Sequence, residues 1–143
     1  MIAAVSRALA QILFDDGLGA VHSVGLRAST EVGGRTLVLC PYAFGESVAR
    51  TMPVAQRPGT APAGRWHLGY LIAPQVADPL DAQEHLWRAA LALRASPVLE
   101  VPGGRATVRF LDPSAEERGA AWAVVELTPR LALFCDVEFV AGA

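Results

Sequence analysis

Residues 66–100, WHLGYLIAPQVADPLDAQEHLWRAALALRASPVLE, decide the fold. Large apolar side chains alternate along the first part, as in a strand with one buried face: Trp66, Leu68, Tyr70 and Ile72. Asp78 and Pro79 then form a helix start, because aspartate caps free backbone amides and proline is tolerated at the first helical position. The helix is expected to end at Arg94, and residues 96–99 to begin a new strand. The stretch therefore predicts a strand, a long helix and a returning strand.

The segments before this stretch carry one helical and two strand-like patterns. Apolar residues recur at helical spacing over residues 2–15: Ile2, Val5, Leu9, Ile12 and Leu13. Gly17 suits the end of that helix. Alternating apolar residues over 24–28 predict a half-buried strand. Both faces of residues 37–40 are apolar, which predicts a central strand covered on both sides.

Residues 51–65 interrupt these patterns. They hold three prolines, two glycines and few large apolar side chains, and they follow neither the helical nor the strand period. Such a segment buries little surface to offset the entropy of ordering. We expect a flexible loop here, within one domain that spans residues 1–143.

The remaining chain predicts two strands on either side of a shorter helix. A strand with Ala106, Val108 and Phe110 on one face should follow a glycine turn, and a second Asp-Pro pair, at Asp112, should start a helix that ends near Val124. The last strand should bury one face: Leu131, Leu133, Cys135, Val137 and Phe139. The predicted fold class is α/β (α+β), a single mixed β-sheet with about three helices packed on it.

The composition of the chain indicates which binding partners to expect and which cellular compartment suits the protein. Hydrophobic residues make up 52% of the chain and charged residues 18%, below the roughly 25% of an average domain, so some apolar surface is expected to meet another subunit. A net charge of −2 offers no broad attraction for phosphate backbones, so nucleic acid is not expected as a partner. We expect no membrane span and no signal peptide. Cys40 and Cys135 both lie in apolar runs, which suits a reducing cytoplasm.

Catalytic, metal and cofactor chemistry find little support in the sequence. Burial of Cys40 would suppress its thiolate, and His and Cys do not occur at the short spacings of a zinc site. We therefore assign no catalytic residue, no metal and no cofactor. His67 is read as a half-buried or interface histidine, His85 as a solvated one, and Trp122 as core. A small cytoplasmic α/β ligand-binding module and a Cys/His hydrolase remain as alternatives.

One group of aromatic residues keeps two interpretations. Tyr42, Phe44 and Tyr70 suit either the lining of a small-molecule pocket or anchors of the sheet. The sequence does not separate the two.

Several segments together carry a resemblance to a known family. These are the run LVLCPYAFGES at 37–47, the run YLIA at 70–73, the Asp-Pro helix, and Pro97-Val98-Leu99. Together they resemble the amino-terminal domain of the tail-terminator (cap) proteins of phage-tail-like extracellular contractile injection systems. The resemblance implies a phage tail-terminator-like fold and a structural protein rather than an enzyme. It also implies a homo-oligomeric ring, expected to be a hexamer, that contacts the inner-tube protein and the sheath protein in a particle assembled in the cytoplasm.

Such a ring needs contacts between subunits or with the tube and sheath. Three arginines flank or lie within the predicted loop, and three acidic residues occupy strand positions that a neighbouring copy can reach. The candidate interface residues are Arg50, Arg57, Arg65, Glu46, Asp136 and Glu138. Solvated charges are the alternative interpretation.

Overall fold

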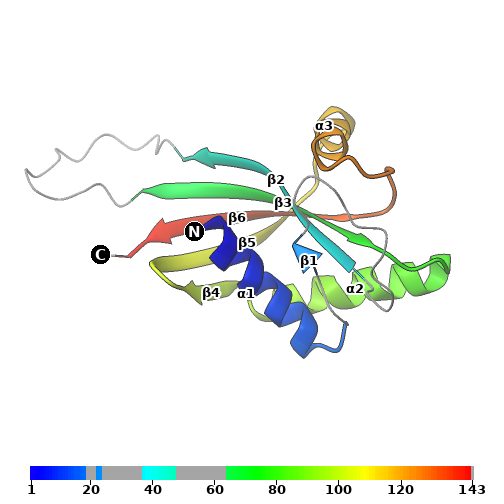
Figure 1. Ribbon diagram of the computed structural model, residues 1–143, viewed down its shortest axis with the longest axis horizontal. Helices are drawn as coiled ribbons and strands as arrows, with labels where there is room; N and C mark the ends of the chain where they lie inside the picture. Colours follow the sequence, from blue (N-terminus) through cyan, green and yellow to red (C-terminus); the bar gives the residue numbers. More distant parts are fainter. Residues whose placement is uncertain (19–21, 24–36, 48–63, 143) are drawn as a thin grey trace, which may run out of the picture.

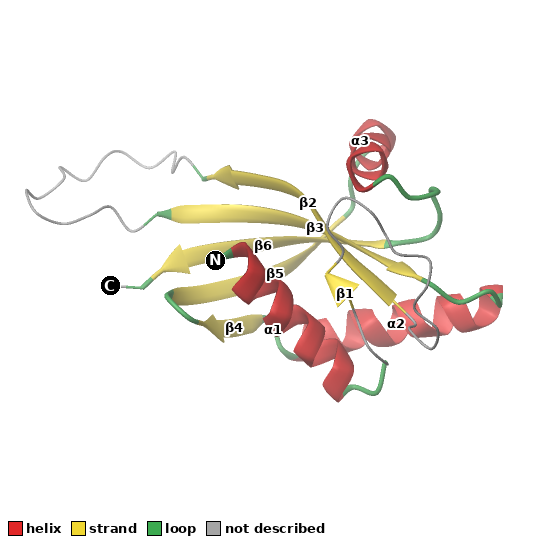
Figure 2. Ribbon diagram, viewed as in Figure 1, coloured by secondary structure: helices red, strands yellow, loops and turns green. Residues whose placement is uncertain are grey.

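The computed structural model describes residues 1–18, 22–23, 37–47 and 64–142 (Figure 1). These residues form one six-stranded sheet in the order β1-β2-β3-β6-β5-β4, in which β1 runs parallel to β2 and every other neighbouring pair is antiparallel. The predicted single mixed sheet with about three helices is confirmed (Figure 2). The elements are α1 (Ile2–Asp15), β1 (His22–Ser23), β2 (Leu37–Glu46), β3 (Arg65–Pro74), α2 (Pro79–Ala95), β4 (Val98–Val101), β5 (Gly104–Leu111), α3 (Ala115–Val125) and β6 (Leu133–Ala141).

Helices α1 and α2 pack on one face of the sheet and α3 packs on the other (Figure 1). The larger core joins α1 and α2 to the sheet through buried residues such as Leu9, Leu93 and Tyr70. The smaller core lies under α3, where Trp122 is only 7% exposed and meets Phe134 edge to face, as predicted for a core tryptophan. The sheet is thus a middle layer with a separate core on each side.

The predicted two-sided burial of residues 37–40 is confirmed. Leu37 and Leu39 belong to the larger core, whereas Val38 and Cys40 belong to the smaller one. Alternate side chains of a strand point to opposite faces, so a run that is apolar on both faces requires cover on both. β2 has that cover because α1 and α3 lie on opposite sides of it.

The two Asp-Pro pairs behave differently. Asp78 caps α2 as predicted, since its Oδ1 accepts from the backbone amides of the second and third helical residues at 2.8 and 3.0 Å. The cap of α3 is instead Ser114, whose Oγ accepts from the Glu117 amide at 3.2 Å. Asp112 lies before the cap and accepts from Arg118 at 2.6 Å. A serine directly before the helix is closer to the free amides, so it takes the capping role.

Several boundaries of the predicted elements differ from those observed. Arg65 is the first residue of β3, where it pairs with Val140, and does not end a loop. Leu131 is exposed because it precedes β6, which begins at Leu133. Phe110 is exposed although it lies in β5, because alternation sets which face a residue is on and not how far the helices cover that face. In α2 the buried residues are Leu86, Ala89 and Leu93. The strand predicted at 24–28 lies outside the described residues, as do residues 51–63 of the loop predicted over 51–65, so both stay predictions.

No helix in the described ranges is both long enough and apolar enough to cross a membrane.

Candidate functional site

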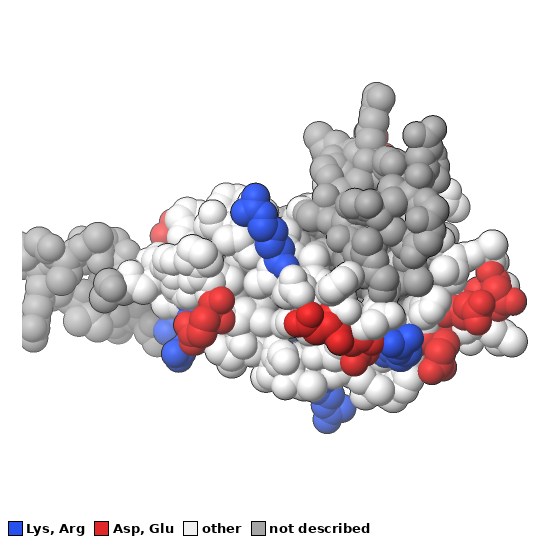
Figure 3. All heavy atoms as spheres, turned by 60° about the horizontal axis from the view of Figure 1, so that its bottom comes forward, with Lys and Arg blue, Asp and Glu red and all other residues white. Residues whose placement is uncertain are grey.

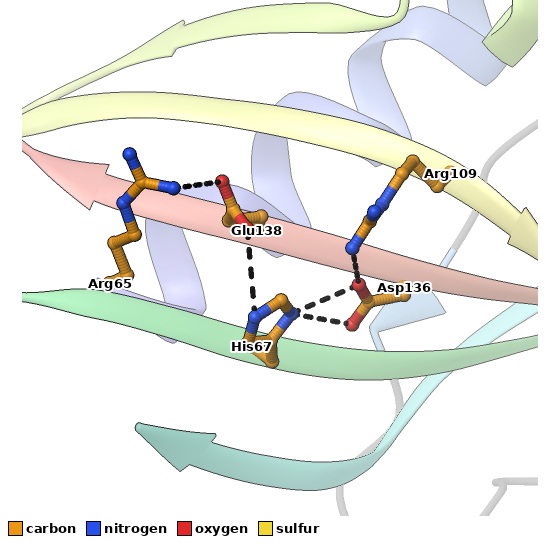
Figure 4. Close-up of polar contacts among 5 residues, drawn as sticks. All are labelled: Arg65, His67, Arg109, Asp136 and Glu138. Carbon is orange, nitrogen blue, oxygen red and sulfur yellow. Dashed lines mark hydrogen bonds and ion pairs between the residues drawn. The ribbon is translucent and has the colours of Figure 1, made fainter. Parts of the chain in front are cut away.

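Helix α3 covers only one end of its face of the sheet. The rest of that face carries charged side chains from three adjacent strands, shown in Figure 4. We call this set the charged strip: Arg65 and His67 on β3, Asp136 and Glu138 on β6, and Arg109 on β5.

The strand register brings these five residues together. His67 lies opposite Glu138, and Arg109 lies opposite Asp136, in the antiparallel ladders on the two sides of β6. Since side chains two residues apart share a face, Asp136 and Glu138 point to the same side as their partners on β3 and β5. The charged strip therefore follows from the pairing of β6 with both of its neighbours.

Asp136 is the centre of the charged strip. Its carboxylate accepts from His67 Nδ1, at 3.1 and 3.0 Å from the two oxygens, and from Arg109 Nη2 at 3.0 Å (Figure 4). The Asp136 side chain is 15% exposed, whereas that of Arg109 is 61% exposed. A carboxylate that is largely removed from water is stabilised by such donors, and removing one of them leaves a buried charge poorly compensated.

Glu138 makes longer contacts at the other end of the charged strip. Arg65 Nη1 lies 3.7 Å from one oxygen and His67 Nε2 lies 3.6 Å from the other. These distances exceed those of a hydrogen bond, so Arg65 and Glu138 form an ion pair that solvent screens, whereas the His67 contact is an ion pair only when the imidazole is charged. His67 is therefore held between two carboxylates, and its side chain is 30% exposed, as expected for a half-buried or interface histidine.

The predicted interface residues are only partly brought together. Arg65, Asp136 and Glu138 all lie in the charged strip, where their observed contacts are within one chain, so their role between subunits stays a prediction. Glu46 lies at the exposed end of β2, next to Trp66 in the ladder. Arg50 and Arg57 lie outside the described residues. Arg109 was not predicted as a member of the charged strip, because only the β5–β6 register places it beside Asp136.

The two cysteines are not arranged for nucleophilic chemistry. Both thiols are free and buried. Burial raises the pKa of Cys40 to about 11, an effect that nearby Arg130 partly opposes, and it raises the pKa of Cys135 to about 12. A thiol of this kind carries almost no thiolate at neutral pH. Among the described residues, no group of three His, Cys, Asp or Glu side chains is placed to hold a metal ion.

His85 was predicted to be solvated, and this prediction is wrong. It is half-buried, and its Nδ1 atom is buried without a hydrogen-bond partner in the described part of the chain. The reason is its place on α2, one turn before the buried Ala89 and on the same side of the helix.

The three aromatic residues that might have lined one pocket anchor different parts of the sheet. Tyr70 is fully buried in the larger core and its hydroxyl group meets that of Ser6. Tyr42 lies edge to face with Phe134 in the smaller core, and Phe44 stacks on Trp66. The pocket interpretation is therefore wrong.

Much of the described surface turned forward in Figure 3 is uncharged. On α2 three large apolar side chains are exposed along one side of the helix, about two turns and then one turn apart: Leu80, Trp87 and Leu91. Large exposed apolar side chains that gather on one element are typical of surfaces that meet another protein. The chain contains no lysine, so its basic side chains other than histidine are all arginine, the residue best suited to ion pairs at interfaces.

Comparisons with known proteins give matches among solved structures. No family model matches the sequence, and no curated protein matches it. The fold matches the sheath/tube terminator of PVC, an extracellular contractile injection system, in its extended state, with a TM-score of 0.69 and 18% sequence identity. That match covers 99% of this chain and 56% of the terminator chain. The cap of the anti-feeding prophage, a tube-terminating cap, matches with a TM-score of 0.61 and 19% identity, over 96% of this chain and 53% of the cap. This chain thus spans a little over half the length of each matched protein, and it has the fold found in these tube-terminating proteins.

Proposed function

We propose that this protein is the tail terminator of a contractile injection system, a structural cap that ends growth of the inner tube. The observation that carries the proposal is the fold match over 99% of the chain to a sheath/tube terminator, together with the match to a tube-terminating cap. The role is structural rather than enzymatic, which agrees with the suppressed thiolates of both cysteines.

The proposed mechanism is steric. Copies of the protein form a closed ring, a hexamer by resemblance, whose one face is complementary to the last layer of tube subunits. The opposite face does not accept a further layer, so growth stops, because head-to-tail addition requires a complementary surface on both faces. Contacts of the same ring with the sheath protein would couple the tube to the sheath. The particle is proposed to assemble in the cytoplasm.

Two surfaces support association between copies or with tube and sheath. One is the exposed apolar side of α2, and the other is the charged strip. Glu46, at the exposed end of β2, and Arg50 and Arg57, which lie outside the described residues, stay candidate contacts proposed from the sequence. The charged strip alternates positive and negative groups across three strands, so a neighbouring copy can exchange ion pairs with it without leaving a charge unpaired.

The deciding experiment is electron microscopy of particles from cells that carry, lack or regain the gene. Without the protein we expect tubes or sheaths of uncontrolled length, or failed assembly, and the wild-type gene should restore uniform particles. Particles of normal, uniform length in the deletion strain would refute the proposal. A variant with Trp87→Glu should fail to restore them, because it places a charge on the exposed apolar side of α2. Ala123→Glu adds the same charge at an exposed position of α3, outside both proposed surfaces, and should restore them.

Ring formation has its own test. Light scattering after gel filtration should give a closed oligomer, either for the protein alone or after addition of the inner-tube protein. A monomer under both conditions would contradict the ring while leaving the fold assignment intact.

A further inference from the structure

A groove lies at the end of the sheet where β3 leads into α2 and where α3 leads into β6. Both connections run side by side at the right of Figure 1. The groove has a volume of about 630 Å³, in the range of binding sites for short ligands. Its walls are mostly apolar and include Pro74, Val76, Pro79, Leu127 and Leu131, with Arg130 among them.

Two backbone carbonyl groups and an aromatic ring, all of them neutral, hold the Arg130 side chain in the wall of this groove. Its Nε donates to the Pro74 carbonyl at 2.9 Å and its Nη1 donates to the Thr128 carbonyl at 3.0 Å. The guanidinium carbon lies 5.8 Å from the centre of the Trp122 ring. A guanidinium group has five N–H donors, so these two bonds orient the group and leave the Nη2 edge for another acceptor.

Arg130 differs from the other arginines of the described residues. Five of them have a carboxylate within 4.0 Å: Arg65, Arg88, Arg105, Arg109 and Arg118. Arg7 and Arg94 have none at that distance, but both are exposed to solvent. Within the same described ranges, Arg130 has no carboxylate at that distance, although it is half-buried and burial lowers its pKa. Carbonyl oxygens orient a cation but do not neutralise it, and a half-buried charge is normally paired with an opposite charge.

Two further features of the groove suit a peptide. Gln75 and Gln83 line it, and their amides can each donate to and accept from a peptide backbone. Leu131 stands on the rim with 62% of its surface exposed, so an aliphatic side chain packed there would remove apolar area from water on both partners.

We propose that this groove binds a peptide segment of a partner protein that presents aliphatic side chains next to a carboxylate, with the carboxylate received by the Nη2 edge of Arg130. The charge complementarity, the apolar walls and the two amides all favour this occupant over a neutral or cationic one. The inference rests on the groove alone and holds whether or not the protein terminates a tail.

The test uses two fluorescent sets of acetylated, amidated pentapeptides and the full-length chain. Four positions of each peptide vary among alanine, valine, leucine and isoleucine, and the remaining position is glutamate in one set and glutamine in the other. Fluorescence anisotropy should show binding of the glutamate set about tenfold tighter than that of the glutamine set, as expected for a hydrogen bond to a charged group. Equal binding of the two sets, or no binding of either, would overturn the proposal.

Three variants locate the binding. Arg130→Gln should remove the preference for glutamate, and Leu131→Asp should weaken the glutamate set by about tenfold through repulsion at an exposed position that does not threaten the fold. Arg105→Gln makes the same charge change at the distant β4–β5 hairpin and should bind like the wild type. Unchanged glutamate preference in both groove variants would show that the peptides bind elsewhere. The peptide-binding result does not depend on particle length. A failed peptide test would therefore refute the groove proposal without refuting the terminator proposal, and the reverse also holds.

Discussion

The hydroxyl groups of Ser6 and Tyr70 provide a sharp test of how α1 is fixed to the sheet. Ser6 is 3% exposed and Tyr70 is fully buried, and the two oxygens lie 2.8 Å apart. The Tyr70 hydroxyl also faces the Ile2 carbonyl at 3.5 Å, the limit of a hydrogen bond. Burial raises the pKa of Tyr70, whereas the hydrogen bond with Ser6 opposes the rise, so the phenol stays neutral under ordinary conditions. The bond therefore joins two neutral groups in the larger core.

The two single substitutions should lower the free energy of unfolding by different amounts. Ser6→Ala leaves the buried phenol with only the long contact to Ile2, so we expect a loss of about 1–3 kcal/mol in the free energy of unfolding. Tyr70→Phe should cost about 1 kcal/mol, because the remaining Ser6 hydroxyl can rotate toward the carbonyl of Ile2, four residues before it in the helix. In the double variant neither hydroxyl remains unpaired, so the two losses should not add, and the coupling should be about 1 kcal/mol.

Urea denaturation of the wild type, both single variants and the double variant measures this coupling. The urea concentration at the midpoint of unfolding should fall in each variant, while the slope of the free energy of unfolding against urea concentration stays constant. Tyr42→Phe is the matched control, since it removes a hydroxyl from a half-exposed ring that packs on Phe134, and it should change stability by less than about 0.5 kcal/mol. Strictly additive losses, or a Ser6→Ala protein as stable as the wild type, would refute the reasoning.

Other substitutions test the thiols and the β4–β5 turn. Cys40→Ala should stay folded, keep its function and lose about 1–2 kcal/mol by urea denaturation; loss of function in the folded variant would reverse its structural assignment. Because burial raises the pKa of Cys40 and Cys135 from 9.0 to about 11 and 12, the unfolded thiols lose their protons first, so stability should fall as pH rises above 9. That fall should be smaller in the variant with both cysteines replaced by alanine. Gly104→Ala should lower the melting temperature, since its Cβ would collide with the Val140 carbonyl, whereas Gly119→Ala has open space and should not lower it.

The features that the sequence predicted correctly are those that depend on residues close together in the sequence. Asp78 caps α2 through amides two and three residues away, and the apolar spacing of residues 2–15 defines the buried side of α1. The two-sided burial of residues 37–40 follows from composition alone. Each of these signals lies within about one helical turn or a few strand positions, so no knowledge of the strand order was needed.

The contacts of the charged strip could not be predicted because they depend on register. Asp136 and His67 are far apart in the sequence, and Asp136 and Arg109 meet only because β6 is inserted between β3 and β5. A shift of one residue would move each charge to the opposite face. The sequence named Asp136 and Glu138 as charges on one strand face, but it carried no information about which cations would lie beside them.

Along one face of β6, and likewise of β3, the side chains change from apolar to charged at the point where α3 no longer covers the sheet. On β6 the side facing α3 begins with Phe134, buried under Trp122, and continues with Asp136 and Glu138. On β3 the same side runs in the opposite direction, from His67 in the charged strip to Leu71 in the smaller core. A face that is apolar throughout would require a longer helix than the 11 residues of α3, and a face that is polar throughout would require none. The switch at the same level on two antiparallel strands therefore leaves part of one sheet face paired in charge and not covered by any helix of the described residues. This is the surface on which we propose that a neighbouring subunit packs, since it would displace no part of the core there.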